Sequence, residues 1–399
     1  GDKVSFFKGD DYIYEKVINI DDLNKEYYFE FEGIYHHPQI YINDELAYER
    51  QYGYSTCLFN ATKYLKQGNN IIKVIAINSN QPNSRWYSGA GIYRNVHLYV
   101  LPKIHIIPRS FKINTIDYKE GKISFKCLLN GISDLTIEIF DNDNKSILKK
   151  EYKSIKEIDD AIVINNPYLW NDEHPYLYKA RITINEQIEE LKFGVRQISL
   201  DKQQGLLING EKVILYGACI HSDNALLGAE SYKEVEYRKV RQLKELGYNA
   251  VRSAHNPICK DFLDACDELG LYVMDEYVDC WYIHKTKFGY SNYMEDNYED
   301  DLFDMVEKDY SHPSVIFYST GNEVSETSEA KGIELQGKMN DLLHKLDSSR
   351  LTTCGINVFF NGIAHTPIST YSSKKAEDEF NAKPKVEGSS DIFNTIGNM

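Results

Sequence analysis

Apolar and polar side chains alternate with a period of two through the first hundred residues, which predicts β-strands. Clear examples are residues 27–32 and 70–77, and turn-forming sequences such as Asn43-Asp44-Glu45 lie between the apolar segments. Short strands separated by regular turns are typical of β-sandwiches. We therefore expect a jelly-roll-like β-sandwich over residues 1–103.

The same period continues through a second segment with different strands. Residues 122–128, 135–140 and 177–184 alternate in the same way, and Asp141-Asn142-Asp143-Asn144 supplies a turn between two of them. A length of about 90 residues with this spacing is typical of an immunoglobulin-like sandwich. The prediction for residues 104–194 is a second β-sandwich.

From about residue 213 the period changes, and strands begin to alternate with helices. Residues 213–216 predict a buried strand, and Gly247 ends the helix that follows. That helix is expected to bury a face formed by Val235, Val240, Leu243 and Leu246.

The βα unit then repeats. Residues 248–252 predict a strand, Gly270 ends the next helix, and further strands are expected at 271–274, 315–319 and 351–354. Helices that feed buried strands in this way indicate a parallel sheet. The fold class is therefore multidomain, β plus α/β.

An eight-fold (β/α) barrel uses about 31 residues per unit, so residues 213–399 hold about six units. Residues 195–399 are therefore expected to form a truncated TIM barrel. We also expect the chain to be a fragment that lacks the last two barrel units and the first strand or so of the N-terminal sandwich.

Net charge, apolar runs and cysteine spacing argue against several classes of binding partner and site for this chain. The net charge of −15, from 60 acidic and 45 basic residues, opposes nucleic-acid binding, and no apolar run is long enough to span a membrane. Seven scattered cysteines without a C-x-x-C pair indicate neither a disulfide framework nor a zinc knuckle. A cytoplasmic location is the simplest expectation, although a leader could have preceded Gly1.

Tyrosine is unusually frequent, with 31 residues. Its flat apolar face and hydroxyl group suit sugars. The abundance of Lys, Ile and Asn alongside it is also what an AT-rich genome produces, and this second explanation is favoured.

Polar side chains gather where the predicted strands end, which is the working face of a βα barrel. A single such residue is usually a cap or a turn residue, but four successive strands favour a functional site. The strand ends carry His221 and Asp223, Arg252 and His255, Asp275 and Glu276, and Asn322 and Glu323.

The sequence Gly321-Asn322-Glu323 is the strongest of these elements. It follows a buried strand, and partial burial of a carboxylate favours its protonated form, which suits a general acid. Asn322 adds an amide that can bind a sugar hydroxyl. The alternative is an N-terminal capping box for a helix that starts near Ser325.

These motifs resemble glycoside hydrolase family 2, which includes β-galactosidases, β-glucuronidases and β-mannosidases. The resemblance covers nearly the whole chain. The matching segments are Ser84 to Arg94, Asn166 to Trp170, His174 to Tyr178, Phe193 to Arg196, Asn209-Gly210, Gly217 to His221, Asn249 to Pro257, Asp275-Glu276 and Gly321 to Glu323.

The resemblance implies a retaining exo-β-glycosidase in which two carboxylates share the chemistry, one as acid and base and the other as nucleophile. Glu323 looks like the acid and base. The nucleophile of the family follows the seventh barrel strand, which we expect to lie beyond this chain. Acidic residues in the Lys-rich C-terminal stretch are instead expected to be solvated loop charges: Glu377, Asp378, Glu379 and Glu387.

The remaining site residues follow from the same resemblance. The loop that carries Arg85 and Trp86 would reach from the first domain to the barrel mouth. Residues expected to bind substrate or hold the carboxylates are His221, Asp223, Arg252, His255, Glu276, Asn322, Arg85 and Trp86. No metal or other cofactor is expected, because Tyr277 and Val278 stand where magnesium-binding members place further ligands.

The expected substrate is a small-molecule or oligosaccharide β-glycoside, and homo-oligomer formation is left open. The loop at His221 to Asn224 is closer to bacterial β-galactosidase members, although many of these have His where Ser222 stands. A β-galactosidase is therefore the leading interpretation and a β-glucuronidase the alternative. From another class, the chain could be a non-catalytic carbohydrate-binding protein with a degenerate barrel.

Overall fold

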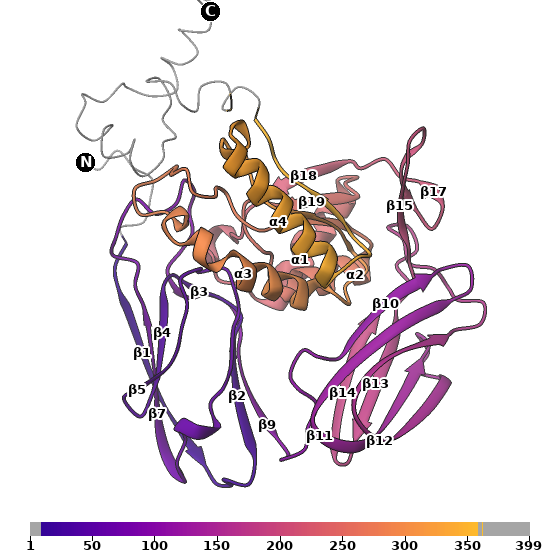
Figure 1. The fold of residues 1–399 in the computed structure, drawn as a ribbon, viewed down its shortest axis with the longest axis horizontal. Helices are drawn as coiled ribbons and strands as arrows, with labels where there is room; N and C mark the ends of the chain where they lie inside the picture. Colours follow the sequence, from indigo (N-terminus) through magenta and orange to yellow (C-terminus); the bar gives the residue numbers. More distant parts are fainter. Residues whose placement is uncertain (1–8, 358–360, 362–399) are drawn as a thin grey trace, which may run out of the picture.

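The computed structural model describes residues 9–357 and residue 361. Two β-sandwiches lie side by side beneath an α/β domain (Figure 1). Each of the three parts has a buried apolar cluster of its own, and further buried residues join the parts together. This arrangement confirms the predicted order of two β domains followed by alternating strands and helices.

The first domain contains a four-stranded antiparallel sheet in the order β1-β7-β4-β5 and a three-stranded sheet in the order β6-β2-β9, and β3 pairs with β8. The apolar side of each alternating strand faces the space between the sheets, where Ile40, Ile42 and Val74 are buried. The strands are β1 (Tyr12–Ile20), β2 (Glu26–Phe31), β3 (Ile34–Tyr35), β4 (Pro38–Ile42), β5 (Glu45–Glu49), β6 (Cys57–Asn60), β7 (Gly68–Ala76), β8 (Gly91–Ile92) and β9 (Val96–Leu101).

The second domain is built around one long hairpin. Strands β11 (Lys122–Phe140) and β12 (Ser146–Val163) pair along their length, with an irregular register around Leu128 and Ser133. The first half of β11 pairs with β10 (Lys112–Asp117), and the second half pairs with β13 (Tyr178–Ile184), which also pairs with β14 (Gln187–Phe193). Strand β11 therefore pairs with strands in both halves of this sandwich.

A small antiparallel sheet precedes the α/β domain. It contains β15 (Ile198–Asp201), β16 (Gly205–Ile208) and β17 (Glu211–Lys212). Asn209 and Gly210, with φ of 54° and 80°, form the tight turn between β16 and β17, and such positive φ values explain Asn-Gly there.

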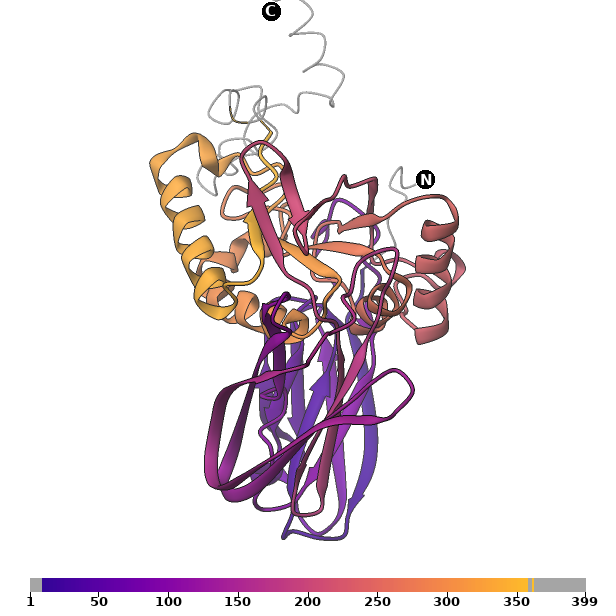
Figure 2. The same ribbon diagram turned by 90° about the vertical axis from the view of Figure 1, so that its right-hand side faces the viewer.

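The α/β domain has a parallel sheet in the order β18-β19-β20-β21-β22 within the described residues. Figure 2 shows α1 and α2 on one flank of this sheet and α4 on the other, where α3 packs beside α4. The elements are β18 (Gly217–Ile220), α1 (Lys233–Glu245), β19 (Ala250–Ser253), α2 (Lys260–Leu269), β20 (Tyr272–Glu276), α3 (Met294–Asp309), β21 (Val315–Ser319), α4 (Ala330–Leu346) and β22 (Leu351–Thr353).

Two local predictions in this domain were wrong. Residues 213–216 are not a buried strand: the first parallel strand begins at Gly217, and Ile214 and Tyr216 are more than half exposed. The side chain of Asn249 holds the backbone of Tyr216 in place of a strand partner. Leu246 is 75% exposed because it caps the C-terminus of α1, and the helix buries Glu236 with Val240 instead.

The glycine predictions were correct. Gly247 and Gly270 both have positive φ and follow α1 and α2, where a residue without a Cβ atom ends a helix most easily. In the described part of the chain, no helix is long and apolar enough to cross a bilayer. All seven cysteines are free thiols.

A tyrosine-rich interface joins the first domain to the α/β domain. Tyr52 stacks on Tyr290 and donates a hydrogen bond from its hydroxyl group to the carbonyl of Tyr277 at 2.6 Å. Arg50 of the first domain forms ion pairs with Asp301 and Asp304 of α3. These contacts hold the first domain against the C-terminal ends of the parallel strands, where the polar residues lie.

Candidate active site

Glu276, the last residue of β20, is the centre of the strand-end cluster. Its side chain is fully buried, and its oxygens accept hydrogen bonds from Arg252 at 2.8 and 2.9 Å, from His255 at 2.6 Å and from Ser319 at 2.7 Å. The donors come from the ends of β19 and β21, so the carboxylate ties three neighbouring strands together. With all its donors supplied by the protein, Glu276 is a buried anchor for the residues around it.

Asn322 joins this anchor to the loop that carries Glu323. Its Oδ1 accepts a hydrogen bond from Arg252 at 2.7 Å, and its Nδ2 donates one to Asp279 at 2.9 Å. Both ends of the amide are therefore held by protein groups. The structure brings Arg252, His255, Glu276 and Asn322 together, as the sequence analysis predicted for these four residues.

Glu323 lies beside this cluster with a partly exposed side chain and a positive φ of 45°. Asn357, just after β22, donates a hydrogen bond to its Oε1 at 3.1 Å. A positive φ is uncommon for a residue with a side chain and is often found at functional sites. The α4 helix begins only at Ala330, and Ser325 leads into a short 3-10 turn without a side-chain cap, so the capping-box alternative is wrong.

Trp86 brings the first domain to the strand ends. Its ring stacks on His221 at 5.6 Å and meets His255 edge-on at 5.5 Å. His221 is exposed and donates from Nδ1 to the carbonyl of Ala254 at 2.6 Å. Trp86, His221 and His255 thus form an aromatic wall beside Arg252.

Asp223 is not part of the cluster. It lies exposed on the loop after β18 and forms no hydrogen bond or ion pair with the rest of the described chain. Its substrate-binding role is unsupported by contacts within residues 9–357.

Asp279 is a central residue that sequence reasoning missed. Arg85 donates to its two oxygens at 2.9 and 2.6 Å, and Lys285 and Asn322 donate to Oδ1 at 3.1 and 2.9 Å. Burial alone would raise the pKa of Asp279, but Lys285 and Arg85 together hold it well below its ordinary value. The only sequence signal was a further carboxylate three residues beyond the strand end.

Glu326 is a second residue missed from the sequence. It is 1% exposed, and its Oε1 accepts hydrogen bonds from the backbone amides of Trp281 and Ile283 at 2.9 and 2.8 Å. Burial raises the pKa of its carboxyl group. Glu326 therefore holds the β20–α3 loop, which carries Asp279 and Lys285, against the loop that carries Glu323.

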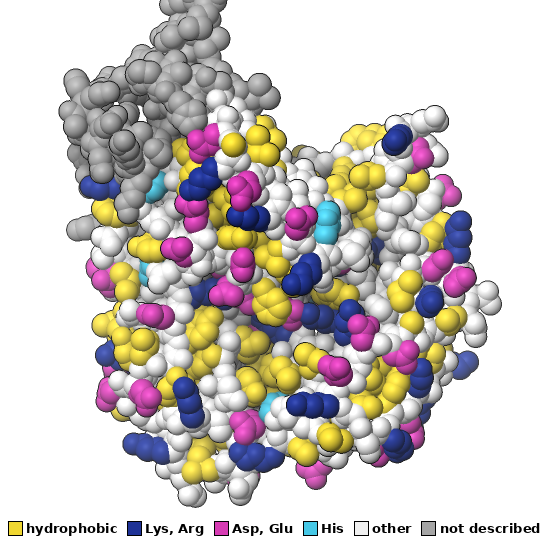
Figure 3. All heavy atoms as spheres, viewed as in Figure 1, with side chains coloured by type: hydrophobic (Ala, Val, Ile, Leu, Met, Phe, Trp, Pro, Cys, Tyr) yellow, Lys and Arg dark blue, Asp and Glu magenta, His cyan; other side chains and the backbone are white. Residues whose placement is uncertain are grey.

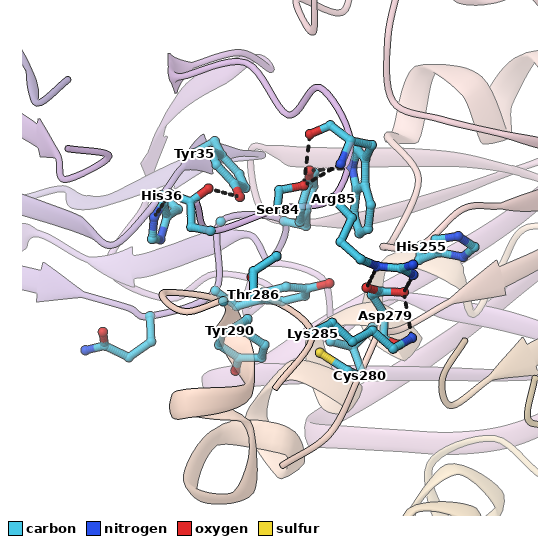
Figure 4. A pocket seen from close by; sticks show the side chains of 18 residues that line it. Tyr35, His36, Ser84, Arg85, His255, Asp279, Cys280, Lys285, Thr286 and Tyr290 are labelled. Carbon is cyan, nitrogen blue, oxygen red and sulfur yellow. Dashed lines mark hydrogen bonds and ion pairs between the residues drawn. The ribbon is translucent and has the colours of Figure 1, made fainter. Parts of the chain in front are cut away.

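A cavity between the first domain and the α/β domain opens beside these groups. Its empty space measures about 530 Å³, including the part open to solvent. Figure 4 shows Arg85 reaching across it to Asp279, with Lys285 on the same carboxylate and His255 nearby. Tyrosine side chains also line this cavity, including Tyr35, Tyr52 and Tyr290.

One group with metal-ligand chemistry lies elsewhere. Asp264 and Asp267 of α2 and His312, which follows α3, place one donor atom each within 4.8 Å of one another. His312 donates to Asp267 at 2.6 Å, and the second oxygen of Asp267 accepts from the amide of Ser314. These hydrogen bonds account for the positions of His312 and Asp267 without an ion.

Because the folded-state pKa of Asp279 is lowered, its ion pair contributes stability above its ordinary pKa of about 4, and this contribution is lost as pH falls toward the lower folded value. We expect Arg85→Met to destabilise the protein by about 1–3 kcal/mol at pH 7, since it removes one charged partner of a buried carboxylate. The difference in melting temperature from wild type should shrink below pH 4. A difference that grows on acidification would contradict the ion pair.

Two sandwiches followed by parallel βα units, with carboxylates and imidazoles at the strand ends, define a multidomain βα-barrel protein. Family models of glycoside hydrolase family 2 match nearly the whole chain: the sugar binding domain over residues 8–102, the central domain over 105–196 and the TIM barrel domain over 198–388. The chain belongs to glycoside hydrolase family 2. This confirms the predicted family and fold class.

Individual relatives differ in their named activities. The chain is 34% identical to β-galactosidase BoGH2A of Bacteroides ovatus, over 80% of this chain and 40% of that protein. It is 27% identical to a β-glucuronidase of Bacteroides fragilis, over 86% of this chain and 54% of that protein. The chain thus spans about half or less of the length of these relatives.

A solved structure shows the same architecture. The family 2 member from Bacteroides cellulosilyticus superposes with a TM-score of 0.82 at 32% identity, over 86% of this chain and 47% of that one.

Proposed function

We propose that the protein containing this chain is a retaining exo-β-galactosidase that acts on a terminal, neutral sugar. The observation that carries the choice of a neutral sugar is the ion pairing of the cations in the described site. Arg252 donates to Glu276, and Arg85 and Lys285 both donate to Asp279. A β-glucuronidase must stabilise a carboxylate on the sugar, and the protein's own carboxylates already occupy donors of all three cations here.

In this proposal Glu323 protonates the oxygen of the leaving group and then removes a proton from the water that releases the sugar. Its partly exposed position next to Asn322, which is bound to Arg252, supports this role. Glu276 does not suit the nucleophile, because its oxygens are occupied by donors from Arg252, His255 and Ser319. We propose that a carboxylate outside the described residues is the nucleophile and that the 399-residue chain alone is inactive.

A panel of chromogenic β-galactoside, β-glucuronide and β-mannoside substrates tests this function. The protein made from the complete gene should hydrolyse the β-galactoside with the highest kcat/KM, and the 399-residue chain should turn over none of them. A preference for the β-glucuronide would overturn the proposed specificity. Full-length rates from the 399-residue chain would overturn the proposed position of the nucleophile.

A further inference from the structure

We propose that Asp279 limits the affinity of the sugar site for uronates, because it pairs with both Arg85 and Lys285 and lowers the positive charge that they present. This inference rests on the proposed β-galactosidase function and assigns one residue to its choice of substrate.

The geometry gives Asp279 two cations from different parts of the fold. Arg85 comes from the first domain and binds both carboxylate oxygens, whereas Lys285 comes from the β20–α3 loop and binds Oδ1. All three side chains line the interdomain cavity, and Figure 4 shows Arg85 extending toward Asp279. A ligand that enters this cavity therefore meets the two cations together with the carboxylate that they share.

Burial makes this pairing effective. The side chain of Lys285 is 3% exposed and that of Asp279 is 10% exposed, so water screens their charges poorly. The neighbouring cation, Arg252, is occupied by the fully buried Glu276. Asp279 thus lowers the combined charge of this group from +2 to +1 and occupies donors of Arg85 and Lys285 that an incoming anion would need.

Asp279 also orients Asn322, the residue before Glu323. Loss of its charge is expected to lower turnover of every substrate through this contact. The ratio of two substrates cancels that shared loss, because both depend on the same loop. A change in the ratio therefore reports charge selection, which a purely structural role of Asp279 would not affect.

The test compares wild type with Asp279→Asn in the protein made from the complete gene. The ratio of kcat/KM for a β-glucuronide to that for a β-galactoside should rise at least tenfold, mainly through a lower KM for the glucuronide. Inhibition by D-glucuronate and by D-galactose provides a second measurement that needs little residual turnover, and glucuronate should gain affinity relative to galactose. The matched control is Asp160→Asn, which breaks the Lys150–Asp160 ion pair on the second domain and should leave both ratios unchanged.

A second variant identifies the cation. Adding Lys285→Met to Asp279→Asn should reverse most of the gain for glucuronide and glucuronate. If Asp279→Asn leaves both ratios at the wild-type value, Asp279 does not select charge, even when wild type prefers the β-galactoside. If wild type itself prefers the β-glucuronide, the proposed function fails, and the charge-selection proposal fails with it.

Discussion

Replacement of Glu323 by Gln should lower kcat for a β-galactoside with a poor leaving group by a factor of about 10²–10⁴, the usual contribution of general acid–base catalysis. Gln has nearly the same shape as Glu and can still accept the hydrogen bond from Asn357, but it has no proton to transfer. Aryl galactosides have leaving groups that need less protonation. The rate of the glycosylation step should therefore fall less for them. Steady-state kinetics on an alkyl and an aryl galactoside would measure this difference.

A measurement of sugar binding distinguishes a catalytic role of Glu323 from the alternative of a non-catalytic carbohydrate-binding protein. Galactose affinity, measured by calorimetry, should stay within a few-fold of wild type in Glu323→Gln, because the substitution leaves the surrounding cluster in place. Glu334→Gln on the exposed face of α4, where Glu334 pairs with Lys338, is the control and should leave turnover unchanged. Undiminished turnover of the alkyl galactoside by Glu323→Gln would exclude the proposed role of Glu323.

The central strands of the α/β sheet could be predicted from their apolar runs. The start of the first parallel strand could not. Strands β19 to β21 are buried on both sides, so their apolar runs coincide with the strands. The run at residues 213–216 is equally apolar, but it lies before β18, the edge strand of the sheet formed by the described residues, and most of its side chains are exposed. An apolar run alone does not tell whether another strand pairs with it.

The tyrosines have a structural use that composition did not indicate. Several of them fill the contact between the first domain and the α/β domain, where Tyr52, Tyr54, Tyr93 and Tyr277 are all nearly or fully buried. Ring packing and hydroxyl groups that find partners make tyrosine well suited to such a mixed interface. Surface charges of both signs are interspersed on the face seen in Figure 3.

The candidate site was predictable where strand order alone brings residues together. Arg252, Glu276 and Asn322 follow consecutive parallel strands, so their meeting required only the topology. Asp279 required knowledge that a loop of another domain places Arg85 opposite it, 194 residues away in the sequence. Asp223 shows the reverse case, since it follows the end of β18 but is exposed and forms no hydrogen bond or ion pair with the described residues of the cluster.

The largest loss of stability is expected from Glu276→Ala. The substitution removes the acceptor of Arg252, His255 and Ser319 at once and leaves the Arg252 guanidinium without its carboxylate. Removing one partner of a buried ion pair costs about 3–5 kcal/mol, because the other charge stays in a poorly solvated place. At about 2–4 °C per kcal/mol for a domain of 150–250 residues, we expect a fall in melting temperature of roughly 6–20 °C.

Glu276→Gln distinguishes the charge from the hydrogen bonds. Gln keeps an acceptor oxygen for Arg252 and fills the same space, so it should lose less stability than Ala while still weakening the hold of Arg252 on Asn322. Thermal unfolding followed by circular dichroism would rank the three proteins as wild type, Glu276→Gln and Glu276→Ala. If Glu276→Ala melts within a degree of wild type, Glu276 is not the anchor of the strand ends, and Arg252 must be held by other contacts.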